Sequence, residues 1–328
     1  MEISRTVSRA SALLEARSRR GVFGLLAASG LSRLVLDEAE SRKKHKKRKK
    51  KPACGKNGSK PIRGKCCANT VAVDGTCRTC DVCASGCAFA TLQVAIDAAG
   101  AGATLAVCPG TYAGGLTLAK NLRLVGDSNE GSATVVRGAG DASVVKVTMG
   151  TITLQNLRLT GGGGDGAGLY IEAGTVTLIG CAVSENTGAS GAYAAIFNGG
   201  SLQLTNTNVS GNTASNGGGI FNVGPLQLTN SSVSGNEASG GGGIYNIGTL
   251  QLTNSVISGN TGQVGGGIYN SGSVLFDSAS RVTGNTASLT GGGIYKNAGT
   301  VTLASSANVN LNNPNNCAGT SAIALCNG

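Results

Sequence analysis

The chain has 328 residues, of which 54 are glycine and only 3% are aromatic. This composition excludes two ordinary globular domains with large hydrophobic cores and favours a repetitive architecture. The formal charge of +11 comes from the first 80 residues, which carry 20 Lys/Arg and 6 Asp/Glu, whereas residues 81–328 carry 7 and 10. The body of the chain is slightly acidic, which argues against a nucleic-acid-binding surface there.

Residues 1–40 are predicted to be an export signal. SRRGVFGLLAASGL, residues 18–31, places two arginines directly before an apolar stretch, as in a twin-arginine signal. The stretch is shorter than the ~20 residues that span a bilayer, Arg33 interrupts it, and we expect no transmembrane span elsewhere. A short amphipathic helix is the alternative. Export implies secretion or display at a bacterial cell surface.

Residues 41–52, SRKKHKKRKKKP, are predicted to be a disordered basic linker, because a cationic run without apolar residues cannot pack. It is either a solvated spacer or a segment that adheres to an anionic wall or membrane surface. A nucleic-acid patch does not suit an exported chain. His45 is the only histidine, so the folded body cannot use a Ser-His or Cys-His relay.

A cysteine-rich module is predicted over residues 53–88. Eleven cysteines indicate an oxidising compartment. Eight lie close together and allow 105 disulfide connectivities: Cys54, Cys66, Cys67, Cys77, Cys80, Cys83, Cys87 and Cys108. We favour disulfides, because so short a segment with few large apolar side chains needs cross-links to fold.

A metal site is the alternative for part of this module. Four of its cysteines match the C-x2-C-x2-C-x3-C spacing of bacterial ferredoxins: Cys77, Cys80, Cys83 and Cys87. Ala88 replaces the proline of that motif, there is no second run, and zinc would also be possible. We therefore expect no cofactor.

Residues 89–328 consist of a repeat of about 24 residues. The strand-like segment ITLQN begins at residue 152, VTLIG at 176, LQLTN at 202, 226 and 250, VLFDS at 274 and VTLAS at 301. Most units continue with V-S-G-N and G-G-G-I-aromatic-N, and none has a helical pattern. Such a period predicts an all-β parallel solenoid of about nine coils, which must stack because no unit buries its inner face alone.

Residues at the same phase of the repeat should form columns along the stack. Five isoleucines are expected to point inward: Ile196, Ile220, Ile244, Ile268 and Ile294. Their aromatic neighbours should lie on the outer face: Tyr170, Phe197, Phe221, Tyr245, Tyr269 and Tyr295. Two asparagine columns are expected at bends, linked from coil to coil: Asn156, Asn206, Asn230 and Asn254, and separately Asn186, Asn212, Asn236, Asn260 and Asn285.

Both ends of an open solenoid need covering, because sheet edges invite aggregation. Residues 90–100, ATLQVAIDAAG, have apolar side chains at helical spacing, with Thr91 as N-cap and Gly100 as stop signal, and predict a helix that caps the first coil. Cys317 and Cys326 are expected to staple the last loop. Cys181 then stays unpaired as a small core residue.

Residues 89–126, FATLQVAIDAAGAGATLAVCPGTYAGGLTLAKNLRLVG, resemble the opening of right-handed β-helix proteins of the pectin-lyase-like superfamily. The GGGI units at 217–295 are similar to the repeats of polymorphic outer membrane proteins, although asparagine directly follows the aromatic residue here. The resemblance implies right-handed winding. It also implies that an enzyme on this fold would use clustered outer carboxylates, which hold calcium or act as acid and base.

Few carboxylates could form such a cluster. The candidates are Asp165, Glu172 and Glu185, with Arg158 as the nearest basic residue. Their phases in the repeat place Asp165 in a turn and Glu172 and Glu185 on different faces, so we expect no catalytic site.

The expected function is that of an exported, non-catalytic surface or extracellular protein, adhesin-like or glycan-binding. The aromatic column is the expected platform for a polysaccharide or cell-surface glycan. A polysaccharide lyase or glycoside hydrolase on the same fold is the alternative, because a fold alone does not decide the function. A metal or redox role of the cysteine module is a third hypothesis.

Overall fold

The computed structural model describes residues 58, 60, 68–127, 133–188, 191, 193 and 195–326. All of these belong to one compact unit, Lys51–Gly328. The predicted export signal, residues 1–40, and the basic linker, residues 41–52, lie outside the described residues, as do Cys54, Cys66 and Cys67. The predictions for these segments stay predictions.

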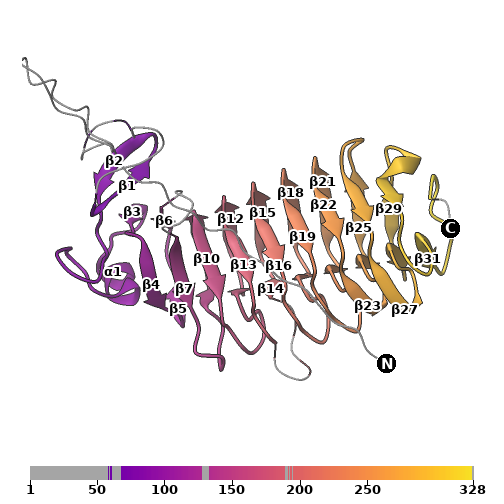
Figure 1. The fold of residues 1–328 in the computed structure, drawn as a ribbon, viewed down its shortest axis with the longest axis horizontal. Helices are drawn as coiled ribbons and strands as arrows, with labels where there is room; N and C mark the ends of the chain where they lie inside the picture. Colours follow the sequence, from indigo (N-terminus) through magenta and orange to yellow (C-terminus); the bar gives the residue numbers. More distant parts are fainter. Residues whose placement is uncertain are drawn as a thin grey trace, which may run out of the picture. The chain divides into compact units, whose positions relative to one another are not determined.

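Short parallel strands dominate the described residues and form three sheets of nine strands each (Figure 1). The first sheet contains β3 (Ala103–Ala106), β6 (Leu122–Val125), β9 (Thr151–Gln155), β12 (Thr175–Ile179), β15 (Ser201–Thr205), β18 (Pro225–Thr229), β21 (Thr249–Thr253), β25 (Ser273–Phe276) and β29 (Thr300–Thr302). The second contains β4 (Gly110–Ala113), β7 (Thr134–Arg137), β10 (Leu157–Thr160), β13 (Ala182–Ser184), β16 (Asn208–Ser210), β19 (Ser232–Ser234), β22 (Val256–Ser258), β26 (Arg281–Thr283) and β30 (Val309–Asn310). The third contains β5 (Leu116–Leu118), β8 (Val145–Val147), β11 (Leu169–Ile171), β14 (Ile196–Asn198), β17 (Ile220–Asn222), β20 (Ile244–Asn246), β24 (Ile268–Asn270), β28 (Ile294–Lys296) and β31 (Cys317–Gly319).

Each coil contributes one strand to each sheet, and equal phases of the repeat lie side by side. Leu202 pairs in register with Leu226, which pairs with Leu250. The predicted parallel β-solenoid is therefore confirmed. Right-handed winding, which the resemblance implies, stays a prediction.

The core fills the space between the three sheets. The predicted isoleucine column, Ile196 to Ile294, is fully buried, as are most inward leucines of the first sheet and valines of the second. Alternation along each strand explains this arrangement, because every second side chain points inward.

One predicted asparagine column is buried and hydrogen-bonded along its whole length. Asn212 Nδ2 donates to Asn236 Oδ1 at 2.9 Å, and Asn236 Nδ2 donates to Asn260 Oδ1 at 2.9 Å. The other column lies at exposed bends, where Asn156, Asn206, Asn230 and Asn254 adopt φ of 47–54°. The buried column confirms the predicted links from coil to coil. The exposed column confirms the predicted bends, because asparagine tolerates left-handed backbone, but among its described members only Asn230 and Asn254 bond to each other, at 2.8 Å.

A third asparagine column, which was not predicted, directly follows the aromatic residues. Asn198, Asn222, Asn246 and Asn270 are fully buried and bonded coil to coil at 2.7–2.8 Å. In the described residues Asn198 Oδ1 has no hydrogen-bond partner. In the preceding coil the residue in register with Asn198 is Ile171, whose side chain has no hydrogen-bond donor, so the column begins at Asn198.

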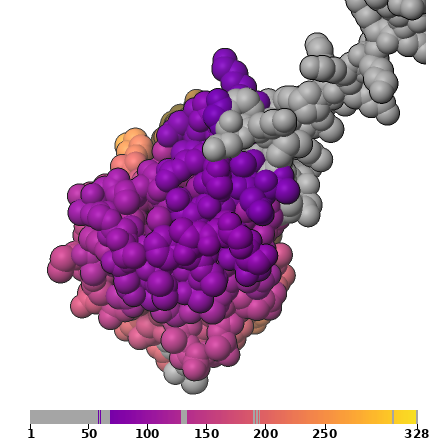
Figure 2. Space-filling view, turned by 90° about the vertical axis from the view of Figure 1, so that its left-hand side faces the viewer, coloured from indigo at the N-terminus to yellow at the C-terminus, as the bar shows by residue number. Residues whose placement is uncertain are grey.

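A helix covers the N-terminal end of the stack, as predicted. The helix α1 (Leu92–Ala98) buries Leu92, Ala95 and Ile96, while Thr91 sits at the N-cap position without a side-chain cap bond. Gln93 completes the open edge of β5, because its Oε1 accepts from the Thr117 amide at 2.9 Å. Figure 2 shows early residues, in indigo, covering this end. No described helix is long and apolar enough to cross a bilayer.

The cysteine-rich module packs directly on the solenoid. The strand β1 (Thr70–Val73) pairs antiparallel with β2 (Thr76–Thr79), and Val71 and Val73 of β1 share a hydrophobic cluster with Ala106 and Val125 of the first coils. Asp74 accepts two bonds from Arg123, at 2.7 and 2.8 Å. Contacts thus cross the boundary predicted between residues 88 and 89.

A disulfide closes the C-terminal end. Cys317 bonds to Cys326, as the sequence predicts, and Ile323 between them is buried against the core. The 3-10 turn Ser306–Asn308 and β30 precede this loop. Two further short strands, β23 (Thr261–Val264) and β27 (Thr286–Thr290), pair on the flank between the second and third sheets.

Leu311 stands at a bend where the preceding coils carry glycine. Its φ is 54° and it is 84% exposed, whereas Gly211, Gly235, Gly259 and Gly284 at the same phase have φ of 61–64°. Left-handed backbone costs an L-residue about 1–2 kcal/mol. Glycine avoids this cost, but part of the gain is lost because glycine gives up more conformational entropy on folding. We expect Leu311→Gly to raise the free energy of unfolding in urea by about 0.5–1 kcal/mol. Destabilisation would contradict this explanation.

Candidate functional site

The aromatic column expected to bind a ligand lies on the outer side of the third sheet. Its members are in register from Tyr170 to Tyr295. Neighbouring rings stack nearly parallel, with centroids 4.4–5.8 Å apart and interplanar angles of 8–28°. Each interior ring therefore turns its faces toward the next rings along the stack and its edge toward solvent.

This stacking leaves little ring face for a sugar. Phe221 is only 7% exposed, because Tyr193 lies against it with a centroid distance of 4.4 Å. At the N-terminal end of the column, Lys146 Nζ lies 5.5 Å from the Tyr170 centroid. The geometry favours a structural role, in which ring pairs stabilise adjacent coils.

The glutamate candidates lie on different sheets and pair with different cations. Glu172 follows β11 and contacts Lys146 at 3.1 Å. Glu185 follows β13 and contacts Arg158 at 2.7 Å. All four side chains are more than one third exposed. Each carboxylate thus has its own cation, after strands of different sheets.

Asp165 has a role in turn geometry. Its Oδ1 accepts from the Tyr193 amide at 2.9 Å, and its carbonyl oxygen accepts from Ser143 Oγ at 2.7 Å. These bonds hold together the turns of three successive coils. Among the described residues, Asp165 contacts neither glutamate candidate.

The cysteines with ferredoxin-like spacing are joined by disulfides. Cys80 bonds to Cys108 and Cys83 to Cys87, and Cys77 is disulfide-bonded as well. The described residues contain no cluster of histidine, cysteine and carboxylate side chains that could hold a metal ion. The Cys80–Cys108 bond anchors the module to the first coil.

Cys181 is a free, buried thiol at the start of an inward column that continues with Thr207 and Ser231. Its Sγ donates to the Leu154 carbonyl at 3.2 Å. Burial raises the pKa of this thiol from 9.0 to about 11, despite hydrogen bonds that lower it.

This raised pKa predicts an alkaline loss of stability. As pH rises, the thiol ionises at a lower pH in the unfolded chain than in the folded protein. The contribution of the buried thiol to the free energy of unfolding is therefore present below pH 9 and disappears between about pH 9 and 11. We expect a loss of about 2 kcal/mol at pH 10.5 relative to pH 8. Cys181→Thr, which matches Thr207 in the next coil, should lack this component in urea unfolding. Equal losses in both proteins would refute the assignment.

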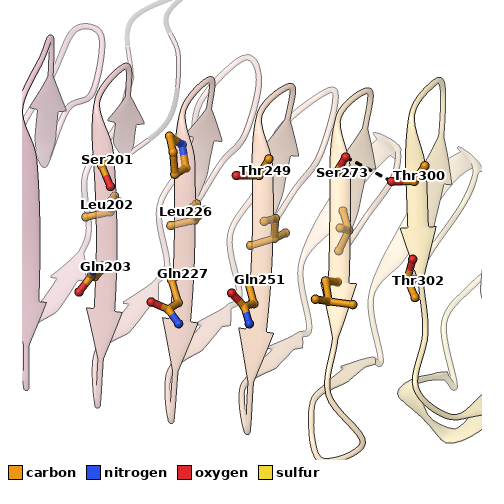
Figure 3. A pocket seen from close by; sticks show the side chains of 14 residues that line it. Ser201, Leu202, Gln203, Leu226, Gln227, Thr249, Gln251, Ser273, Thr300 and Thr302 are labelled. Atoms are coloured by element: carbon orange, nitrogen blue, oxygen red, sulfur yellow. Dashed lines mark hydrogen bonds between the residues drawn. The ribbon is translucent and has the colours of Figure 1, made fainter.

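A shallow groove of about 460 Å³ runs along the outside of the first sheet across β15, β18, β21, β25 and β29 (Figure 3). We call it the glutamine face. Register aligns Gln203, Gln227 and Gln251 side by side, and the same row continues with Leu275 and Thr302. A second row consists of Ser201, Pro225, Thr249, Ser273 and Thr300.

The glutamine face combines polar and apolar groups without charge. None of its lining residues is ionisable. Within the described residues the three glutamine amides have no side-chain hydrogen-bond partner, while Thr300 Oγ1 donates to Ser273 Oγ at 3.2 Å. Pro225 is exposed and Leu275 is 48% exposed. The glutamine amides can therefore donate and accept hydrogen bonds next to apolar surface.

The glutamine face was not predicted, although the repeat contains a signal for it. LQLTN recurs three times, and the glutamine between two buried leucines must point outward.

Comparison with known proteins finds no matching family model, no matching curated protein and no matching solved structure.

Proposed function

We propose that the protein is an exported, non-catalytic protein of the cell surface or extracellular space, and that its solenoid binds a glycan through the glutamine face. The observation that carries this proposal is the row of three unpaired amides in an uncharged groove. Unpaired amides, hydroxyl groups and exposed apolar side chains are the groups that recognise the hydroxyls and C–H faces of sugars.

Two observations support a non-catalytic, extracellular role. The carboxylates that an enzyme of this fold would need are engaged separately, by Lys146, Arg158 and the Tyr193 amide. The disulfides suit an oxidising compartment.

Other parts of this proposal depend on sequence alone. The twin-arginine pattern supports export, and the basic run at 41–52 supports adhesion to an anionic wall or membrane surface. The resemblance of residues 89–126 to pectin-lyase-like proteins supports right-handed winding.

Binding and catalysis can be separated in one experiment. The full chain is incubated with neutral and acidic polysaccharides, and both retention on the polymer and release of new reducing ends are measured. We expect retention without release. Release of sugar ends would contradict the proposal, and Asp165→Ala, Glu172→Ala and Glu185→Ala would then identify the residues responsible.

A further inference from the structure

We infer that the glutamine face binds an uncharged linear polysaccharide that lies along the solenoid axis and crosses at least three coils. This inference rests on the proposed function and names its ligand class. Three properties of the face support it: its neutrality, its repeat and its unpaired amides.

The absence of charge in the groove selects against acidic polymers. A uronate would bring one carboxylate per unit against a surface that offers no cation, and removing an unpaired charge from water is costly. The coils that line the groove carry two cations, Arg281 of β26 and Lys296 of β28. These strands belong to the second and third sheets, and neither cation lines the groove.

The repeat of the amides selects a polymer that has a matching repeat. Strand spacing in a sheet is about 4.7–4.9 Å, so identical amides recur at that interval along the stack. A pyranose unit of an extended polysaccharide is close to one such interval in length. An extended peptide repeats its same-side groups every two residues, about 6.6–6.8 Å, and would fall out of phase.

The amides of the face are available, in contrast to those of the inner columns. The buried asparagines use their side chains to link coils, whereas the side-chain amides of Gln203, Gln227 and Gln251 are hydrogen-bonded to no described residue. Each can donate and accept. Because one hydrogen bond exchanged with water contributes little net affinity, several must act together, and affinity should grow with chain length.

The test measures retention of the full chain on cellulose, xylan, mannan and polygalacturonate in 1 M salt, where the Debye length is about 3 Å and the basic run is screened. Oligomers of one to six units from the retained polymer then serve as competitors. We expect retention on at least one neutral polymer, and competition that increases at least tenfold between one and four units. Gln227→Leu should weaken retention by about threefold to tenfold.

Gln263→Leu is the matched control, because Gln263 is an exposed glutamine of β23 outside the groove. It should retain polymer like the original chain. Retention on polygalacturonate alone, or equal competition by monomer and hexamer, would overturn the inference while leaving glycan binding in place. Retention on no polymer would overturn the proposed function itself. Displacement by extended peptides but not by sugars would overturn both.

Discussion

Asn236→Ala is expected to lower the free energy of unfolding by about 3–5 kcal/mol, one of the largest effects of any single substitution in this chain. Asn236 Oδ1 accepts from the Asn212 amide at 3.1 Å and from Asn212 Nδ2 at 2.9 Å, and Asn236 Nδ2 donates to the Val209 carbonyl at 3.0 Å. Alanine removes the hydrogen-bond partner of these buried groups of Asn212 and Val209. Urea unfolding followed by circular dichroism measures the loss.

Asn206→Gly is the matched control for Asn236→Ala. Asn206 is exposed at φ 50°, and its side chain has no described hydrogen-bond partner, so glycine should change stability by less than about 0.5 kcal/mol. Equal losses at both positions would show that the buried column does not link the coils.

Gly242→Ala is expected to destabilise the solenoid by at least about 2 kcal/mol. A Cβ atom at Gly242 would overlap the carbonyl oxygen of Thr261 and lie 2.6 Å from that of Gly266. Both are backbone atoms of the next coil, so the coils would have to separate. Thermal unfolding of the variant gives the size of the effect.

Gly259→Asn serves as the comparison for Gly242→Ala. Gly259 has φ 62°, which asparagine tolerates, and a Cβ there would meet nothing closer than 3.9 Å. We expect a change within about 0.5 kcal/mol. If Gly242→Ala also changed stability by less than about 0.5 kcal/mol, close packing between coils would not explain why the GGG segment contains glycine.

The repetitive parts of the fold could be predicted from sequence because each phase of the repeat has one physical task. Ile244 must be buried and the Asn236 side chain must satisfy backbone groups, and the same residue type recurs in neighbouring coils. The helical spacing of apolar residues in 90–100 also predicted the capping helix. Its details, such as Gln93 completing the edge of β5, depend on distances that no repeat encodes.

The functional surface was harder to predict, because alternation along a strand says which side chains point outward but not what they contact. The aromatic column was correctly placed in register, yet the ring orientation that hides the faces follows from packing between coils. The buried column beginning at Asn198 was missed for a related reason. Alternation places Asn198 on the same side as Ile196, and the pattern had assigned that side to apolar residues.

The most direct test of the proposed site compares two variants of the full chain on the same retained polysaccharide. One carries Gln203→Leu, Gln227→Leu and Gln251→Leu, and the other carries Tyr245→Phe and Tyr269→Phe, which keep the ring stack but remove two outer hydroxyls. We predict that the glutamine variant loses at least tenfold in affinity and that the tyrosine variant stays within about twofold of the original. Unchanged binding by the glutamine variant, with loss in the tyrosine variant, would move the site to the aromatic column and contradict this account.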